Sequence, residues 1–198
     1  MLTPKQNMLE VIKGGNPDRF VNQYEAVQLL FHPFMFTNPL LQPGQENVVN
    51  AWGVTNTFPK GVPGSFPVHT PDKIVVKDIE DWKDYVHAPS LKFTQDQWDM
   101  VKAQYDAVDG EQAFKAAFVA PGLFEQTHHL CEISNALVYY ITNPDEMHDL
   151  IKYLTEWELE LAEGICSNLH PDALFHHDDW GGLDSTFMSP AMFDEFLL

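Results

Sequence analysis

Positively charged residues are scarce in this chain of 198 residues, which has 11 Lys and Arg against 29 Asp and Glu and a formal net charge of −18. Binding to nucleic acid or to an anionic membrane requires clustered cations that neutralise phosphates. The sequence therefore excludes a nucleic-acid binder and gives no electrostatic attraction to a membrane.

Cysteine is almost absent, since only Cys131 and Cys166 occur. Both lie in apolar stretches, where we expect them to be buried, and neither has CxxC or Cys/His spacing around it. A disulfide framework and a cysteine-rich zinc site are thus excluded.

Long apolar runs are missing as well. Residues 1–13 lack the apolar core of a signal peptide, and no run of about 18 apolar residues occurs, so we expect no export, no membrane anchor and a cytoplasmic location. Hydrophobic residues nevertheless make up 44% of the chain and aromatic residues 13%, which excludes a disordered acidic chain. The length fits one domain over residues 1–198, although a complete (β/α)8 barrel needs about 250 residues.

Helix signals are clear at several places. Thr3-Pro4-Lys5-Gln6 predicts a capped helix that stops at Gly14-Gly15, and Thr94-Gln95-Asp96-Gln97 predicts a second one. Apolar spacing predicts helices over 78–86 and 122–140, and a long helix of about seven turns that begins at Pro144. Ser189-Pro190 predicts a further capped helix.

Strand signals are weaker before residue 70 because prolines and glycines interrupt every period between residues 16 and 70. Short strands are expected there at Phe20–Gln23 and Trp52–Thr57. Buried strands are expected at 114–120 and 172–176. Strands that alternate with long helices indicate an α/β fold with parallel βα units.

The chain ends at Phe196-Leu197-Leu198 inside an amphipathic helix, without a glycine, a basic last turn or a following strand. We therefore expect an artificial boundary, a frameshift or a split gene rather than a natural domain end.

Two polar segments follow predicted strands, where ligands of α/β sheets bind. The first is His176-His177-Asp178-Asp179-Trp180-Gly181-Gly182. Its imidazoles and carboxylates can exchange protons, and the glycines allow a ligand to approach.

Neighbouring side chains of an extended segment point in opposite directions, so His176 and His177 are not expected to share one ligand, and no metal site is predicted. The alternative is structural: one histidine bonds to a backbone carbonyl, and an aspartate caps the next helix.

The second segment runs from Pro121-Gly122 to His128-His129. A turn after a buried strand, followed by the polar start of a helix, can place backbone N–H groups, Glu125 or His128 at the mouth of a pocket. The alternative is a plain connection with both histidines facing solvent.

Together these segments resemble the uroporphyrinogen decarboxylase family, which also holds corrinoid-linked methyltransferases and O-demethylases. The segments that carry the resemblance are Lys13-Gly14-Gly15-Asn16-Pro17-Asp18-Arg19, Ala51-Trp52-Gly53-Val54, Phe118-Val119-Ala120-Pro121-Gly122, Asp172 to Gly181, and Phe187-Met188-Ser189-Pro190-Ala191-Met192-Phe193. The resemblance implies a (β/α)8 TIM barrel whose active site lies at the carboxyl ends of the strands. It implies that the enzyme is either a lyase of porphyrin biosynthesis or a methyltransferase. It also implies that residues 1–198 are only the N-terminal portion of that barrel.

The resemblance places site residues in both polar segments. It implies that Asp178 and His177 are catalytic, and it implies no metal ligand. The resemblance implies that Asp179, Trp180, Gly181 and Gly122 bind a small-molecule substrate. His128 joins this predicted set because of its place in the second polar segment. A decarboxylase of this type needs no cofactor, whereas a methyltransferase would use a corrinoid protein as partner and zinc held by a part of the barrel that lies beyond Leu198. The partner is a corrinoid protein or a second copy of the chain, and no nucleic acid or membrane partner is expected.

The arginine-rich motif that follows the first strand in true decarboxylases is missing, because the corresponding stretch reads Arg19-Phe20-Val21-Asn22-Gln23-Tyr24-Glu25. A chain of net charge −18 without this motif is poorly suited to a polycarboxylate such as uroporphyrinogen. Methyl transfer or O-demethylation of a less charged compound is therefore favoured over uroporphyrinogen decarboxylation. The alternative is a non-catalytic half-barrel that binds a ligand or a complementary chain.

Overall fold

The structure is a computed structural model that describes residues 1–198 except for the side chain of Gln23. Its chain divides into two compact units. Unit 1 comprises Met1–Phe34, Lys92–Val119 and Leu161–His177, and unit 2 comprises Met35–Leu91, Ala120–Glu160 and Asp178–Leu198. Each unit is described by itself below.

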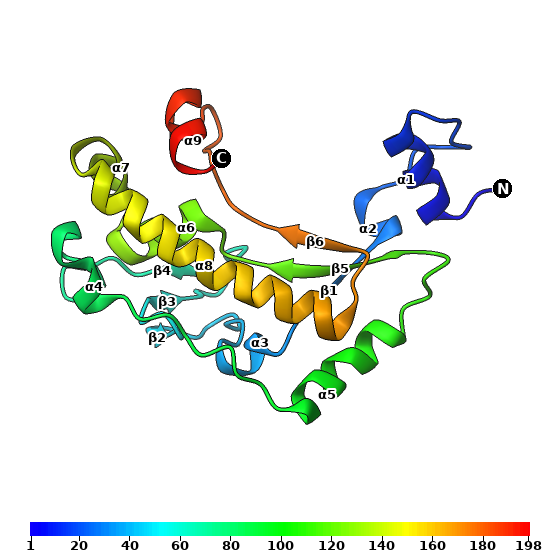
Figure 1. The fold of residues 1–198 in the computed structure, drawn as a ribbon, viewed down its shortest axis with the longest axis horizontal. Coiled ribbons are helices and arrows are strands. Elements are labelled where there is room, and N and C mark those ends of the chain that lie inside the picture. The colour runs from blue at the N-terminus through cyan, green and yellow to red at the C-terminus, as the bar shows by residue number, and fades with distance from the viewer. The chain divides into compact units, whose positions relative to one another are not determined.

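Unit 1 is built on a parallel sheet of three strands, β1 (Val27–Leu30), β5 (Phe114–Val119) and β6 (Ala173–His176), in the order β1-β5-β6. Leu30 pairs with Ala117, and Phe118 pairs with Phe175. Figure 1 shows β5 and β6 side by side with their arrowheads pointing the same way. The α/β class with parallel strands is thus confirmed. Within the described residues the sheet remains open, with β1 and β6 at its edges.

The predicted strands of unit 1 agree with the sheet in part. The strands expected at 114–120 and 172–176 are β5 and β6. The expectation that the last one is buried is wrong, because three of its four residues are exposed at the sheet edge. The strand expected at Phe20–Gln23 is also wrong. Helix α2 (Gln23–Ala26) begins there, and the strand follows it as β1, where consecutive apolar residues meet the sheet.

Helices α1 (Pro4–Lys13) and α5 (Gln95–Asp106) form where the capping signals predict them. Thr3 and Thr94 each accept a hydrogen bond from the backbone of the glutamine three residues on, and both capping boxes are complete. Gly14 ends α1 at φ 65°, a left-handed conformation that favours glycine.

Unit 2 combines a small antiparallel sheet with a helical core. Its strands are β2 (Val48–Val49), β3 (Thr55–Thr57) and β4 (Phe66–Pro67), so the strand expected at Trp52–Thr57 is confirmed over its last three residues. Ile79–Asp81 forms a 3₁₀ turn. The helices that lie wholly within unit 2 are α4 (Trp82–Tyr85), α6 (Leu123–Cys131), α7 (Ile133–Thr142) and α9 (Pro190–Phe196). The core holds Trp52, Phe124, Leu130, Tyr140, Leu150 and Leu154, all buried.

Two helices remain to be placed. The short helix α3 (Phe34–Thr37) begins at the last residue of unit 1, and the long helix α8 (Pro144–Leu169) contributes residues to both units. The long helix predicted from Pro144 is confirmed as the 26 residues of α8. Its residues from Leu161 on belong to unit 1 and its earlier residues to unit 2.

The single helix predicted over 122–140 is wrong, because α6 and α7 are separate helices. Glu132 breaks them apart with φ 73°. Its side chain then accepts a hydrogen bond from the Asn135 N–H at 3.1 Å and so caps α7. Apolar spacing continues through this break and does not reveal it.

The surroundings of the two cysteines differ. Cys131 is buried as predicted, and burial raises the pKa of its thiol to about 12. Cys166 is exposed, so the expectation that both are buried is wrong for this residue.

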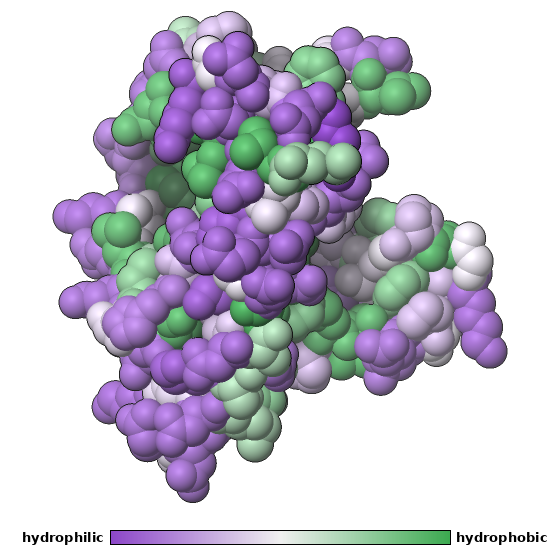
Figure 2. Space-filling view, turned by 90° about the vertical axis from the view of Figure 1, so that its right-hand side faces the viewer, coloured by the Kyte–Doolittle hydropathy of each residue, from purple (hydrophilic) through white to green (hydrophobic). Residues whose placement is uncertain are grey.

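The helices and one face of the surface bear on contact with a membrane. In the part of the chain that the structure describes, no helix combines the length and apolar character needed to cross a membrane. On the face drawn in Figure 2, hydrophobic side chains lie at the surface among hydrophilic ones.

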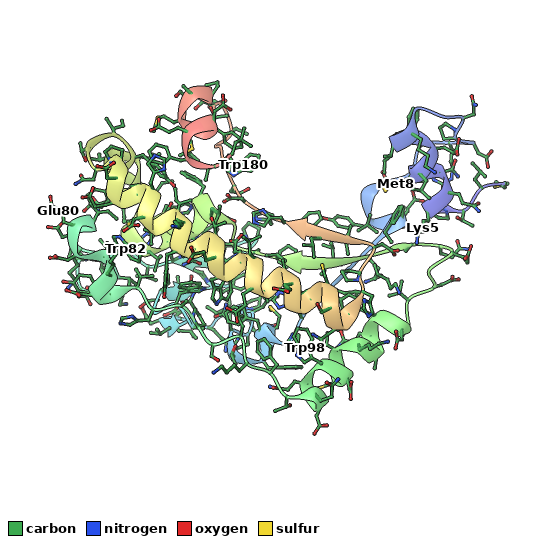
Figure 3. The ribbon with its side chains drawn as sticks, viewed as in Figure 1. Lys5, Met8, Glu80, Trp82, Trp98 and Trp180 are labelled. Atoms are coloured by element: carbon green, nitrogen blue, oxygen red, sulfur yellow. The ribbon has the colours of Figure 1, made fainter. Side chains whose placement is uncertain are left out.

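Trp98 packs where α5 meets the last part of α8 in unit 1 (Figure 3). Its ring lies 5.6 Å from that of Phe93, and a Cβ atom added at Gly164 would lie 3.5 Å from the Trp98 ring. That distance is an ordinary van der Waals contact, so an alanine fits at this position.

We expect Gly164→Ala to raise the free energy of unfolding by about 0.5–1 kcal/mol, because alanine costs less backbone entropy than glycine in a helix. Urea denaturation of both proteins measures the difference. Gly164→Leu serves as the matched variant, since its larger side chain must displace Trp98 and should lower the stability. An equal gain from both substitutions would contradict the described contact.

Candidate functional site

The candidate site lies in unit 2, where the Asp178 side chain caps helix α6. Its two carboxylate oxygens accept hydrogen bonds from the backbone N–H groups of Phe124 and Glu125, at 3.0 and 2.8 Å. The residue before the helix, Gly122, has no side chain with which to cap it. A carboxylate at the positive end of a helix also interacts favourably with the helix dipole. Asp178 therefore supplies the missing cap from the loop that follows β6 in sequence.

His128 lies one turn after Phe124 on α6, and the two rings are 5.3 Å apart. The imidazole is half-buried. Burial, and then the charge of His69, lower its pKa, while the carboxylates of Asp178 and Asp179 oppose that shift. The structure thus brings His128 into electrostatic reach of both aspartates, and the alternative that His128 faces solvent does not hold.

His69 and His129 complete a group of three histidines with His128. The rings of His128 and His129 meet edge to face at 4.8 Å, and His69 Nε2 lies 3.1 Å from the His129 carbonyl oxygen. Burial, together with the charges of His128 and His69, lowers the pKa of His129 to about 3. His129 is therefore neutral at neutral pH.

A pair of hydroxyl groups, from Thr127 and Tyr140, joins α6 to α7. Thr127 Oγ1 donates to the Phe124 carbonyl oxygen at 2.7 Å and lies 3.0 Å from the Tyr140 hydroxyl. Since a threonine hydroxyl has a single proton, Tyr140 donates to Thr127. Burial raises the pKa of Tyr140, which keeps the phenol protonated. This pair ties α6 to α7 in the core of the unit.

The other residues predicted in the loop after β6 are Asp179, Trp180 and Gly181, and none of them caps α6 as Asp178 does. Trp180 is 44% exposed, and its ring lies 4.7 Å from that of Phe193 on α9 (labelled in Figure 3). Gly181 forms an antiparallel bridge with Thr186, and a Cβ atom there would lie 3.1 Å from the Ser185 carbonyl oxygen. Asp179 is exposed. Trp180 and Gly181 therefore shape the loop.

Two predicted residues lie at the ends of strands. Gly122, buried in unit 2, precedes the first turn of α6. His177 belongs to unit 1, where its backbone N–H donates to the Val119 carbonyl oxygen at 2.9 Å. The structure thus brings Asp178, Asp179, His128 and Gly122 together in unit 2.

Several residues of this site have no signal in the sequence. His69 comes from a proline-rich stretch, and the pairing of Thr127 with Tyr140 depends on the break at Glu132. Gln126 is 4% exposed, and its Nε2 has no hydrogen-bond partner among the described residues. A buried donor without a partner is costly unless a ligand or water accepts its hydrogen bond.

The donor set of the site does not suit a metal ion. Among the described residues, no three His, Cys, Asp or Glu side chains are grouped so that they could hold a metal. The resemblance places the zinc ligands of a methyltransferase beyond Leu198, and this part of the prediction lies outside the given residues. What the site offers is hydrogen bonding and proton exchange.

Comparison with known proteins gives no family assignment. No family model matches the chain, and no curated protein or solved structure matches it either.

The cap predicts a clear order of stabilities. We expect Asp178→Ala to lower the free energy of unfolding by about 1–2 kcal/mol, because two backbone N–H groups lose their acceptor. Asp178→Asn should lower it less, since its amide oxygen still accepts one hydrogen bond. Urea denaturation tests this, with the exposed Asp184→Ala as the matched control. Equal stability of Asp178→Ala and the wild-type protein would contradict the cap.

The histidine group predicts a pH dependence. The pKa of His129 is about 3 in the folded chain against an ordinary 6.5, so the unfolded chain binds the proton first. Stability is therefore full above about pH 6.5 and falls as the pH drops towards 3. His129→Gln should reduce this fall, measured as the difference in unfolding free energy between about pH 7.5 and about pH 4.5. His87→Gln, at an exposed histidine, is the control. An unchanged fall in His129→Gln would contradict the assignment.

Proposed function

We propose that the chain is the N-terminal portion of a (β/α)8 barrel enzyme of the uroporphyrinogen decarboxylase type, which transfers a methyl group from a small methylated or methoxylated compound. Three parallel strands in the order β1-β5-β6 are compatible with one part of such a barrel. In a barrel, further strands would pair with both sheet edges.

The observation that carries the proposal is the site on α6, where Asp178 fixes the start of the helix and His128 lies in reach of Asp178 and Asp179. In O-demethylation, the bond between the methyl carbon and the oxygen breaks. The methyl group passes to a nucleophile such as a corrinoid, and the oxygen leaves as an anion that takes up a proton. In this proposal His128 delivers that proton.

Two opposing effects act on the proton of His128. A lowered pKa makes its imidazolium a stronger acid than an ordinary one, and the carboxylates of Asp178 and Asp179 favour its protonated form. Asp178 was predicted to be catalytic. Since both of its oxygens accept backbone hydrogen bonds, we assign it a positioning role instead. His177 stays a predicted catalytic residue.

The substrate class follows from charge and hydrogen bonding. The single arginine of the chain, Arg19, forms two hydrogen bonds of 3.2 Å to the Glu25 carboxylate, so it is not available as a fork for substrate carboxylates. The buried Gln126 donor is suited to a neutral acceptor, such as an ether oxygen. Both features favour a weakly charged substrate over a polycarboxylate.

A binding role without catalysis is the second candidate, and the exposed edge strand β6 favours it. Residues 153–198 contain ten Asp and Glu but no Lys or Arg. Exposed apolar side chains in this region include Leu174, Trp180, Leu183 and Phe187. A complementary chain could add a strand to β6, with basic residues facing the acidic ones.

Activity of the native gene product separates the candidates. We expect methylation of a reduced corrinoid by a methoxylated aromatic compound, followed by absorbance, and His128→Gln should slow it by about 100-fold. His87→Gln is the matched control and should keep the wild-type rate. Release of coproporphyrinogen from uroporphyrinogen would contradict methyl transfer. Absence of both reactions, with capture of a basic partner chain, would favour the binding role.

A further inference from the structure

A pocket of about 230 Å³ lies in unit 2, where α4 and α8 meet. The side chains that line it are those of Trp82, Lys83, Val86, His87 and Tyr153. None of these residues belongs to the candidate site on α6 or to the loop after β6. Since drug-sized ligands need larger pockets, this one suits a small ligand.

Two aromatic rings form walls of this pocket. Trp82, labelled on α4 in Figure 3, is 4% exposed, and Tyr153 on α8 is half-buried. Their rings lie 5.4 Å apart and are inclined to each other by 53°. The Tyr153 hydroxyl accepts a hydrogen bond from the Ala88 N–H at 2.8 Å, which holds its ring against the segment after α4. The faces of such rings carry partial negative charge and attract cations.

A cation of the chain itself already lies against one of these rings. The Lys83 ammonium is 5.4 Å from the centre of the Trp82 ring, and it is also ion-paired with the Asp149 carboxylate. Asp149 lies one turn before Tyr153 on α8. The hydrogen bond from Lys83, and then the charge of Lys83, lower the pKa of Asp149, so this carboxylate is ionised at neutral pH. The pocket thus combines two aromatic rings with a negative charge.

The Lys83 ammonium is easily replaced. The side chain of Lys83 is 69% exposed and that of Asp149 is 52% exposed, and ion pairs so open to water contribute little stability. A lysine ammonium is also compact and strongly hydrated, so it gains little from an aromatic face. A methylated ammonium group is less hydrated, and its methyl groups can contact the rings directly.

An anionic ligand is disfavoured in this pocket. The basic side chains that line it are Lys83 and His87. An anion would have to separate Lys83 from Asp149, and it would then face that carboxylate on a chain of net charge −18. A cation meets the opposite conditions, because the carboxylate and both rings attract it.

We propose that this pocket binds a small organic cation that carries a methylated ammonium group. The methyl groups contact the Trp82 and Tyr153 rings, Asp149 balances the charge, and the Lys83 side chain moves into solvent. No residue assigned to methyl transfer takes part, so either proposal can fail while the other holds.

A matched pair of probes tests this proposal on the complete chain. Choline and the neutral alcohol in which a carbon atom replaces its nitrogen share one shape, and only choline is charged. We expect choline to bind about tenfold more tightly in calorimetric titrations, because only a cation is attracted by the rings and the carboxylate. Asp149→Asn should reduce this preference.

Removal of the competing lysine should strengthen binding. We expect Lys83→Ala to raise the affinity for choline about threefold, since an exposed ion pair no longer has to be broken. Lys102→Ala is the matched control, because Lys102 also forms an exposed ion pair, with Asp106 on α5, and should leave the affinity unchanged. A lower or unchanged affinity in Lys83→Ala would contradict the displacement of Lys83.

Proton NMR of the wild-type protein supplies a readout that needs no variant. The indole N–H resonance of Trp82 should move on addition of choline. An unmoved resonance, or equal affinities for choline and the neutral alcohol, would overturn the proposal. A preference for choline that persists unchanged in Asp149→Asn would also overturn it, because the cation would then bind elsewhere on the acidic surface.

Discussion

The hydrogen bonds from Phe124 and Glu125 to the Asp178 carboxylate determine where helix α6 begins. Every helix leaves its first N–H groups without partners inside the helix, and Gly122 cannot provide one from its own side chain. The cap thus comes from a residue 54 positions away along the chain. Since α6 carries Thr127, His128 and His129, the arrangement of the candidate site depends on this remote contact.

Charge explains what such a site can bind. The chain has a large negative net charge, yet His129 is held neutral by burial, and the only arginine is paired with Glu25. In the proposed function, the neutral His129 and the buried amide and hydroxyl groups of this site favour neutral, partly apolar ligands. The proposed substrate is therefore weakly charged and not a polycarboxylate.

Capping residues and apolar spacing correctly predicted the helices and strands that depend on interactions between residues close in sequence. The capping boxes at Thr3 and Thr94, the long helix from Pro144 and strand β5 all appear as the sequence indicated. The failures have a common cause in tertiary structure. The break at Glu132 requires a positive φ that apolar spacing does not reveal, and β6 is exposed because it lies at a sheet edge. Asp178 was predicted to be catalytic, and the structural alternative was that one of the loop's aspartates caps the following helix. Its cap on α6, like the contact of His69 with His129, joins residues that are far apart in sequence, so no spacing in the sequence predicts it.

The central claim is that the Asp178 carboxylate holds the first turn of α6, and amide hydrogen exchange of Phe124 and Glu125 tests it most directly. In the wild-type protein we predict that both amides are protected, since each donates to a carboxylate oxygen. In Asp178→Ala we predict that these two amides lose protection while those of strand β5 keep it. Unchanged protection of Phe124 and Glu125 in that variant would contradict the account.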